Sequence, residues 1–477
     1  MAAMMTATLS SCGTSFLELD PSQEIDSDKA ILTAADVTTA LNGSYYWMGS
    51  SSFCGRNLIA LPDVGSDDSG NFGYTTHMYS IYNYIFDEND SYVSAIWTAA
   101  YKVADTTTRL IVAGEKLLET ASESDQKSIK KDLSQAYALR AYATFAVANV
   151  YALPYTQENL ETPGAVLLHQ PIAPLEKVSR STLKETYEYI LEQLNSAAKY
   201  ANEVQVGTGS VFYMNEVAIA ALEARVRLYM GDFENAKRFA QKAIDIKKSS
   251  LPAEQQNNLI ITSASAYADM FDKTAGSAED IFVIAKASDD NLSANSINTL
   301  YTTYGITVSD ELAGLYSDSD IRKAKMTSTR ASSSGRVYFV GGKYAQPITN
   351  IPVIRIPEMY LIIAECEAVQ GNASAAAAAL FEVAKRDAAI ESVDDLPSDL
   401  SELTQFIVTE RRRELFQEGH RLFDARRRGE TIFVSEGTQK LTDGLYLFPI
   451  PSKEINAGFG VTQNANWANY MPTPVKN

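Results

Sequence analysis

Apolar residues recur at helical spacing along most of the chain. Val37, Leu41 and Tyr45 follow one another at intervals of four, which predicts a helix over 36–48 that begins after Thr33. The same periodicity predicts further helices, over 92–120, 123–150, 182–202, 215–230, 233–247, 358–370, 373–390 and 400–418. The pattern therefore favours a mostly helical protein.

The helical pattern breaks between residues 250 and 355. Short runs rich in β-branched and aromatic residues occur there, such as 280–285 and 335–340, and Ser, Asn, Asp and Gly separate them. Runs of this kind, bounded by turn-forming residues, predict short strands and loops. We expect an irregular mixed segment between two helical parts.

Two helix–turn–helix units resemble each other, with Gly231 and Gly371 at their turns. Glycine permits the positive φ angle that ends the first helix, and small residues at matching positions let the two helices approach closely. The small residues lie seven before and five after each glycine: Ala224, Ala236, Ala364 and Ala376. This spacing resembles the tetratricopeptide repeat, although the tryptophan of its first helix is missing. It predicts a scaffold of helical hairpins.

The net charge of the chain restricts the kinds of molecule that it can bind. Lysine and arginine number 41 and aspartate and glutamate 59, a formal net charge of −18. Such a surface repels phosphate backbones and anionic lipid headgroups, which argues against nucleic-acid binding. Three cysteines and three histidines leave few ligands for zinc or haem.

Catalytic motifs are missing from the sequence. It contains no His-Glu-x-x-His, Gly-x-Ser-x-Gly or Walker A pattern. A surface glycosidase is an alternative, because such enzymes use two carboxylates. Adjacent acids do occur, but 59 acidic residues produce such pairs by chance, so an enzyme has no positive support: Asp67-Asp68, Asp289-Asp290 and Asp394-Asp395.

The N-terminus resembles a bacterial lipoprotein signal. An apolar stretch ends in Leu9-Ser10-Ser11-Cys12, like a lipobox whose cysteine becomes lipidated. We interpret residues 1–11 as a partial signal segment, Cys12 as the lipidation site and 13–27 as a polar tether. No lysine or arginine precedes Cys12, and the alternative is an ordinary apolar N-terminus with an accidental cysteine. Cys54 and Cys366 would then remain, and we expect them to be unpaired.

A charged motif occupies residues 410–428. Glu410, Glu414 and Glu418 recur every four residues in line with the apolar stripe of Leu403 and Ile407, and arginines flank them. Carboxylates aligned in this way with an apolar stripe predict partly buried ion pairs that fix helix packing. The histidine that follows, His420, is then a packing residue and not a catalyst.

The same motif resembles the C-terminal signature of the SusD/RagB-type outer-membrane lipoproteins of the Bacteroidetes. Further segments agree with this family in the expected order: 9–20, 40–46, 355–365, 446–451 with 454–456, and 462–467. In the last of them, Ala465 and Asn466 stand where Pro-Gly is commoner. The resemblance spans nearly the whole chain.

The resemblance implies a mostly α fold. It consists of a tetratricopeptide-like hairpin scaffold in a helical region 12–250, and a loop-rich, mixed α/β region 251–477 whose irregular insert is 251–355. The two regions are expected to pack as one unit.

The resemblance also implies a function. Such proteins are not enzymes, need no cofactor, and sit lipid-anchored and exposed on the outer membrane. They capture oligosaccharides, sometimes peptides, and pass them to a SusC-like TonB-dependent transporter. Peptide capture and a transporter lid with negligible ligand affinity remain alternatives.

Two segments carry candidate ligand-binding residues, because sugars stack on aromatic faces and hydrogen-bond to polar side chains. In 63–79 we select Asp67, Asp68, Asn71, Tyr74 and His77. The alternative is a solvated loop whose aromatic residues pack onto the scaffold. Calcium at the first three of these residues is a further alternative, although their spacing differs from an EF-hand loop.

The second segment, 291–304, contributes Tyr301 and Tyr304, for which core packing is the alternative. The tryptophans suggest packing: Trp47 and Trp97 occur at helical spacing, and Trp467 lies in the terminal motif. Without a loop tryptophan, the binding platform would consist of tyrosines, or the ligand would be a peptide.

Overall fold

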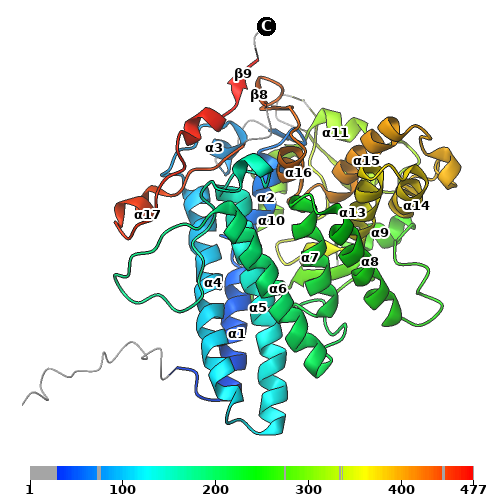
Figure 1. Ribbon diagram of the computed structural model, residues 1–477. Coiled ribbons are helices and arrows are strands. Elements are labelled where there is room, and N and C mark those ends of the chain that lie inside the picture. The colour runs from blue at the N-terminus through cyan, green and yellow to red at the C-terminus, as the bar shows by residue number, and fades with distance from the viewer. Residues whose placement is uncertain are drawn as a thin grey trace, which may run out of the picture.

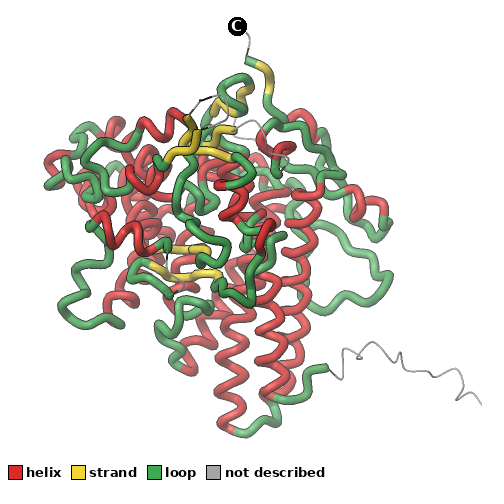
Figure 2. The backbone as a smooth tube through the Cα atoms, turned by 180° about the vertical axis from the view of Figure 1, so that it is seen from behind, coloured by secondary structure: helices red, strands yellow, loops and turns green. Residues whose placement is uncertain are grey.

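The computed structural model of the protein describes residues 30–71, 77–272, 275–331, 335, 337–442 and 446–475. Helices dominate these residues, as the apolar spacing predicts (Figure 1). The strands are short, and Figure 2 shows them as small separate groups among the helices and loops. No helix in these ranges has an apolar stretch long enough to cross a membrane.

The first half of the chain contains the longest helices: α1 Ala34–Met48, α2 Asn57–Val64, α3 Tyr79–Tyr82, α4 Ser91–Leu118, α5 Glu123–Tyr151, α6 Leu183–Val204, α7 Glu216–Tyr229 and α8 Phe233–Ser249. The second half contains shorter ones: α9 Ala264–Met270, α10 Ile297–Thr302, α11 Asp310–Gly314, α12 Lys323–Met326, α13 Ile356–Val369, α14 Ala373–Ala384, α15 Leu400–Leu415, α16 Arg421–Arg427 and α17 Ser452–Asn456. The strands are β1 Ser69–Asn71, β2 Asp280–Ile284, β3 Ile306–Val308, β4 Thr329–Ala331, β5 Val337–Phe339, β6 Ile351–Arg355, β7 Ile432–Val434, β8 Gln439–Leu441 and β9 Thr473–Pro474.

Side-chain caps fix where the long helices begin. Thr33 and Asp36 form a reciprocal capping box at α1, and Thr182 and Glu185 form another at α6. Ser122 caps α5 by accepting from a backbone N–H of its first turn. These caps satisfy N–H groups that have no partner within the helix, so each start is defined within a residue or two of its predicted position.

The two predicted hairpins are confirmed. Gly231 ends α7 with φ of +72°, and Gly371 follows α13 with φ of +82°, both in the left-handed region that favours glycine. The four alanines at matching positions are fully buried. The α7–α8 and α13–α14 hairpins lie side by side, with α8 against α13 (Figure 1).

All the strands pair antiparallel in small sheets. One has the order β1-β3-β5-β4, another joins β2 to β6, and the third has the order β7-β8-β9. The pairing of β1 with β3 aligns Ser69 with Val308 and Gly70 with Thr307. It therefore connects the segment after α2 directly to the irregular part of the chain.

One hydrophobic core reaches from the first helix to the end of the chain. It includes Val37 of α1, Trp97 of α4, Phe282 of β2 and Ile450 shortly before α17. Cys54 and Cys366 are buried in the same core as free thiols, as predicted, and burial raises the pKa of each thiol to about 12. Elements from both halves of the chain thus depend on shared apolar contacts.

Helix α14 ends six residues before the predicted boundary, at Ala384 instead of residue 390. The chain turns here because the side chain of Arg386 is fully buried and bound to Glu279 of the loop before β2. The backbone carbonyl of Arg386 also accepts from the N–H of Ile321. A long-range contact thus overrides local helix propensity.

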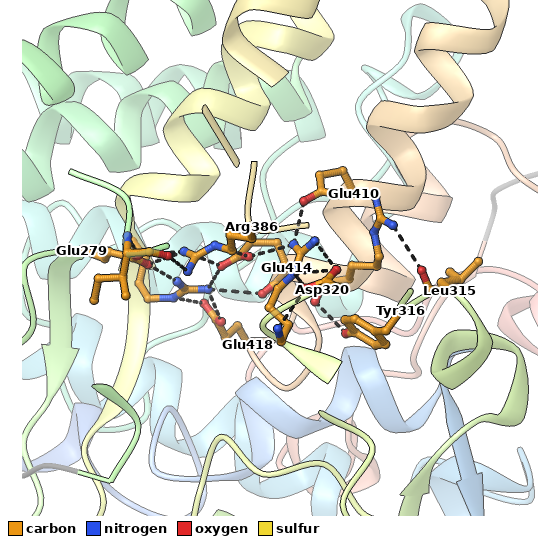
Figure 3. Close-up of polar contacts among 12 residues, drawn as sticks. Glu279, Leu315, Tyr316, Asp320, Arg386, Glu410, Glu414 and Glu418 are labelled. Carbon is orange, nitrogen blue, oxygen red and sulfur yellow. Dashed lines mark hydrogen bonds and ion pairs between the residues drawn. The ribbon is translucent and has the colours of Figure 1, made fainter. Parts of the chain in front are cut away.

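The charged motif forms a buried network of ion pairs, as its spacing predicts (Figure 3). Glu414 contacts Arg322 at 3.1 Å, Arg355 at 2.8 Å and Arg386 at 3.2 Å, and all four side chains are fully buried. Glu410 binds Arg322 at 2.6 Å. Burial alone would raise the pKa of Glu414, but the charges of Arg386 and Arg355 hold it well below its usual range.

Candidate functional site

The two segments that carry candidate ligand residues lie side by side. His77 comes from the first segment and Tyr304 from the second, 227 residues apart by subtraction of their numbers, and their rings stack with centroids 3.7 Å apart and planes at 21°. The pairing of β1 with β3 explains this contact, because it holds residues 69–71 against residues 306–308. The structure therefore brings together two residues that were selected independently.

Polar and aromatic groups surround this stacked pair, which we name the His77–Tyr304 platform. Arg56, at the start of α2, donates from Nη1 to Asn295 Oδ1 at 3.3 Å. Its guanidinium lies 5.8 Å from the ring centroid of Tyr92. The platform rings and Tyr92 are only half-buried. Half-exposed ring faces beside amide and guanidinium groups suit a ligand with apolar faces and hydroxyls.

The platform histidine favours its neutral form. Partial burial lowers the pKa of His77, and the positive charge of Arg56 lowers it further. A neutral imidazole has one nitrogen that donates and one that accepts, so it can pair with a hydroxyl in either direction.

A cleft of about 410 Å³ is lined in part by residues of β1 and β3. Aromatic side chains from β5 and β7 line it, and Phe433 is 53% exposed. Carboxylates stand at its rim, and its volume lies in the range of small-molecule sites. The residues with side chains suited to ligand contact are Asp310, Glu311, Tyr338, Phe339, Phe433 and Glu436.

The paired acids of the first segment are bound to arginines. Asp67 receives two hydrogen bonds from Arg421, each 2.7 Å long, and Asp68 contacts Arg412 at 2.6 Å. Asp68 is fully buried, so its selection as a ligand contact is wrong. Asp67 lines the cleft but is one-tenth exposed, and its oxygens are already bonded. These acids anchor the loop to the charged C-terminal motif.

Tyr301 is 1% exposed and packs edge-on against Phe416, so its selection as a ligand contact is wrong as well. It is a buried residue of α10, whereas Tyr304 follows the helix and is only partly buried. Tyr74 and Cys12 lie outside the described residues, as does the side chain of Asn71.

The aspartates proposed for calcium therefore have arginine partners. No group of three or more His, Cys, Asp or Glu residues is arranged to hold a metal ion within the ranges that the structure describes. Calcium at this loop gains no support from the geometry.

Comparison with known proteins supports one family for this chain. A model described as "SusD family" matches residues 264–432, and one described as "Starch-binding associating with outer membrane" matches residues 15–228. A relative named SusD-like protein P2, from Formosa agariphila, is 24% identical over 93% of this chain and 94% of its own length. Both family models describe SusD-type proteins and together they cover most of the chain, which supports the SusD/RagB family.

Solved structures of SusD-type proteins share the fold. A SusD superfamily protein from Bacteroides thetaiotaomicron is 24% identical, with a TM-score of 0.77 over 91% of this chain and 100% of its own. A putative sugar binding protein from Bacteroides vulgatus is 23% identical, with a TM-score of 0.78 over 92% of this chain and 99% of its own. The mostly helical architecture is thus that of the SusD superfamily.

Several site residues of this chain were not identified from the sequence. Arg56 is an isolated charged residue, and Tyr92 falls in a regular helical pattern. Asn295 lies within the candidate segment 291–304, but nothing distinguishes it from the polar residues around it. Phe433 is recognisable only once β7 is known to expose alternate side chains, since its neighbours Ile432 and Val434 are buried. The run 335–340 could be identified as a strand, but its outward-facing side could not.

Proposed function

We propose that this SusD/RagB-family protein is a carbohydrate-binding accessory protein of the outer membrane. It captures oligosaccharides at the cell surface and delivers them to a SusC-like TonB-dependent transporter. The family description "Starch-binding associating with outer membrane" supports the class of ligand and the location. The lipobox-like segment that ends at Cys12 supports lipid anchoring.

The observation that carries the proposal is the His77–Tyr304 platform. A sugar ring presents C–H groups to an aromatic face and hydroxyls at its edge. Here two stacked half-buried rings lie with an arginine and an asparagine nearby, and the cleft beside β1 and β3 offers room for further sugar units.

Capture without catalysis fits the electrostatics. Glycoside hydrolysis needs one free carboxylate and one protonated acid at a set separation. Asp67 and Asp68 instead bind Arg421 and Arg412. Burial alone would raise the pKa of Asp67, but the charge of Arg421 lowers it, so this group stays an ion-paired carboxylate.

Calorimetric titration of the soluble form that starts after Cys12 tests the proposal. The panel contains polysaccharides, their oligomers and mixed peptides. We expect saturable binding of one glycan class, and Tyr304→Ala should weaken it about 10- to 100-fold, because one stacking face on a ligand contributes about 1–3 kcal/mol. Tyr213→Ala is the matched control, since Tyr213 is 47% exposed and lies outside the platform and the cleft.

Other outcomes would replace the proposal. Binding of peptides but not glycans would indicate a peptide-capturing protein of the same architecture. Release of reducing ends would indicate a surface glycosidase. No detectable binding of any compound in the panel, together with co-purification of a transporter, would indicate a lid with negligible ligand affinity of its own.

A further inference from the structure

A second groove lies apart from the platform and the cleft. Its volume is about 450 Å³, and the end of α1, the first turns of α4 and the start of α17 enclose it. Figure 1 shows α17 beside the upper end of α4. It shares no lining residue with the cleft. The side chains that matter for its chemistry are Trp47, Glu88, Asn89, Ser94, Lys102 and Lys453.

Trp47 lines one wall of the groove, and Tyr46 lies beside it just outside the lining. Trp47 is only partly buried, so the packing predicted for it holds for one part of the ring and leaves another part in the groove. Tyr46 is 69% exposed and stands edge-on to Trp47, with centroids 5.6 Å apart and planes at 74°. The part of the indole that faces the groove can make an apolar contact with a ligand.

The indole holds an ammonium group in place. Lys102 Nζ lies 3.8 Å from the centroid of the Trp47 ring, within the range of a cation–π contact. Within the described part of the chain, neither Lys102 nor Lys453 forms an ion pair. Both ammonium groups are therefore available to pair with a negatively charged ligand group.

Hydrogen bonds hold the wall of the groove that α17 forms against the loop before α4. Ser452, at the start of α17, donates from its backbone N–H to the carbonyl of Glu88 at 2.8 Å and from Oγ to Asn89 Oδ1 at 2.5 Å. These bonds fix α17, and with it Lys453, against the loop before α4. The Glu88 carboxylate is the one negative group among the lining residues, against two cations.

We propose that this groove binds a hexuronate residue of an acidic oligosaccharide. The sugar carboxylate pairs with the ammonium groups of Lys102 and Lys453, and its hydroxyls contact Asn89, Ser94 and Glu88. The exposed part of the Trp47 ring provides the apolar contact. This inference rests on the proposed function of oligosaccharide capture. It names an acidic class of sugar and assigns it to residues outside the His77–Tyr304 platform and the cleft.

Titration with trigalacturonate and with a mannuronate trimer tests the proposal, with galactotriose as the neutral probe. We expect at least one acidic trimer to bind, and Lys102→Gln with Lys453→Gln to weaken it about 30-fold, since a hydrogen bond to a charged group contributes about 1.5–3 kcal/mol before solvent screening. Raising the salt concentration should weaken binding as well.

Lys116→Gln is the matched control, because Lys116 is exposed on the last turn of the same helix. Tryptophan fluorescence gives a second readout: the acidic trimer should change the emission of the wild type and leave that of Trp47→Phe unchanged. Equal affinity for galactotriose, no loss in the double lysine variant, or no binding of either acidic trimer would overturn the proposal. Tyr304→Ala separates the two sites, because it should leave the lysine-dependent binding intact.

Discussion

Asp63 is a fully buried carboxylic acid at the end of α2. Its Oδ2 accepts one hydrogen bond, from the N–H of Gly419 at 3.1 Å, and its Oδ1 has no hydrogen-bond partner. Burial raises the pKa of Asp63 to about 8. The side chain is therefore predominantly protonated at neutral pH, while in the unfolded chain it titrates near pH 4.

The raised pKa of Asp63 predicts a pH dependence. A group that binds its proton more tightly in the folded state contributes stability that is complete below the unfolded pKa and is lost as pH rises through about 8. Asp63→Asn removes this titration without changing the shape. We expect the difference in free energy of unfolding, wild type minus variant, to fall between pH 5 and pH 8. The fall should be at most about 1.4 kcal/mol per pH unit.

Urea denaturation of both proteins at each pH measures this difference. Other buried acids titrate equally in the two proteins and cancel in the subtraction. A difference that does not vary between pH 5 and pH 9 would show that Asp63 is ionised in the folded state.

Residue-scale prediction from the sequence succeeded where the carboxylates themselves follow a regular pattern. The spacing of Glu410, Glu414 and Glu418 in line with an apolar stripe was enough to predict burial and pairing, although partners such as Arg322 and Arg355 lie far away in the chain. Asp67 and Asp68 follow no such stripe, and their partners Arg421 and Arg412 are 354 and 344 positions away, so they looked the same as any exposed acids. Only the three-dimensional structure shows that these carboxylates are bound to arginine side chains.

At the scale of elements, the buried network joins α15 to β6, α12 and the turn after α14. Glu414 is its centre, since three arginines converge on it. Removing one partner from a buried ion pair leaves an uncompensated charge, which usually costs about 3–5 kcal/mol. The network is therefore sensitive to the loss of a single carboxylate.

Glu414→Gln should lower the free energy of unfolding by about 3 kcal/mol or more. Glu402→Gln is the control on the same helix, because Glu402 is exposed in the first turn. Chemical denaturation of the two variants checks the prediction. A loss below about 1 kcal/mol for Glu414→Gln would mean that the arginines find other acceptors.

The sequence pattern did not predict helix α2. The eight residues of α2 are all buried, so they show no amphipathic period, and Pro62 lies within the helix. A helix that is hidden on every side lacks the alternation by which α1, α4 and α6 were found. The loop predicted to start at residue 63 consequently begins two residues later, after Val64.

At the scale of the whole molecule, the chain end is tied to the helical scaffold. Asn464 donates from Nδ2 to the carbonyl of Tyr151 at 2.8 Å and accepts from Arg180 at 2.7 Å. Gln463 forms two 2.8 Å hydrogen bonds with the backbone of Ile450. The Gln-Asn pair of the terminal motif thus has a physical role, which is to hold the last segment against α5.

Asn464→Ala should lower the free energy of unfolding by about 1–3 kcal/mol, because it removes the hydrogen bonds that join this buried side chain to the carbonyl of Tyr151 and to Arg180. Asn469→Ala, at an exposed position five residues later, should have little effect. Limited proteolysis gives the sharper readout, since the variant should release C-terminal peptides faster than the control. Equal cleavage rates would show that Gln463 alone secures the segment.

The two buried thiols have a practical consequence for studying ligand capture in solution. Cys54 and Cys366 are fully buried and their pKa values are raised to about 12, so almost no reactive thiolate is present at neutral pH. In the soluble form that starts after Cys12, a cysteine introduced on the surface becomes the one site that a maleimide dye can reach. Fluorophores can thus be attached beside the platform or the second groove while the native cysteines stay in place.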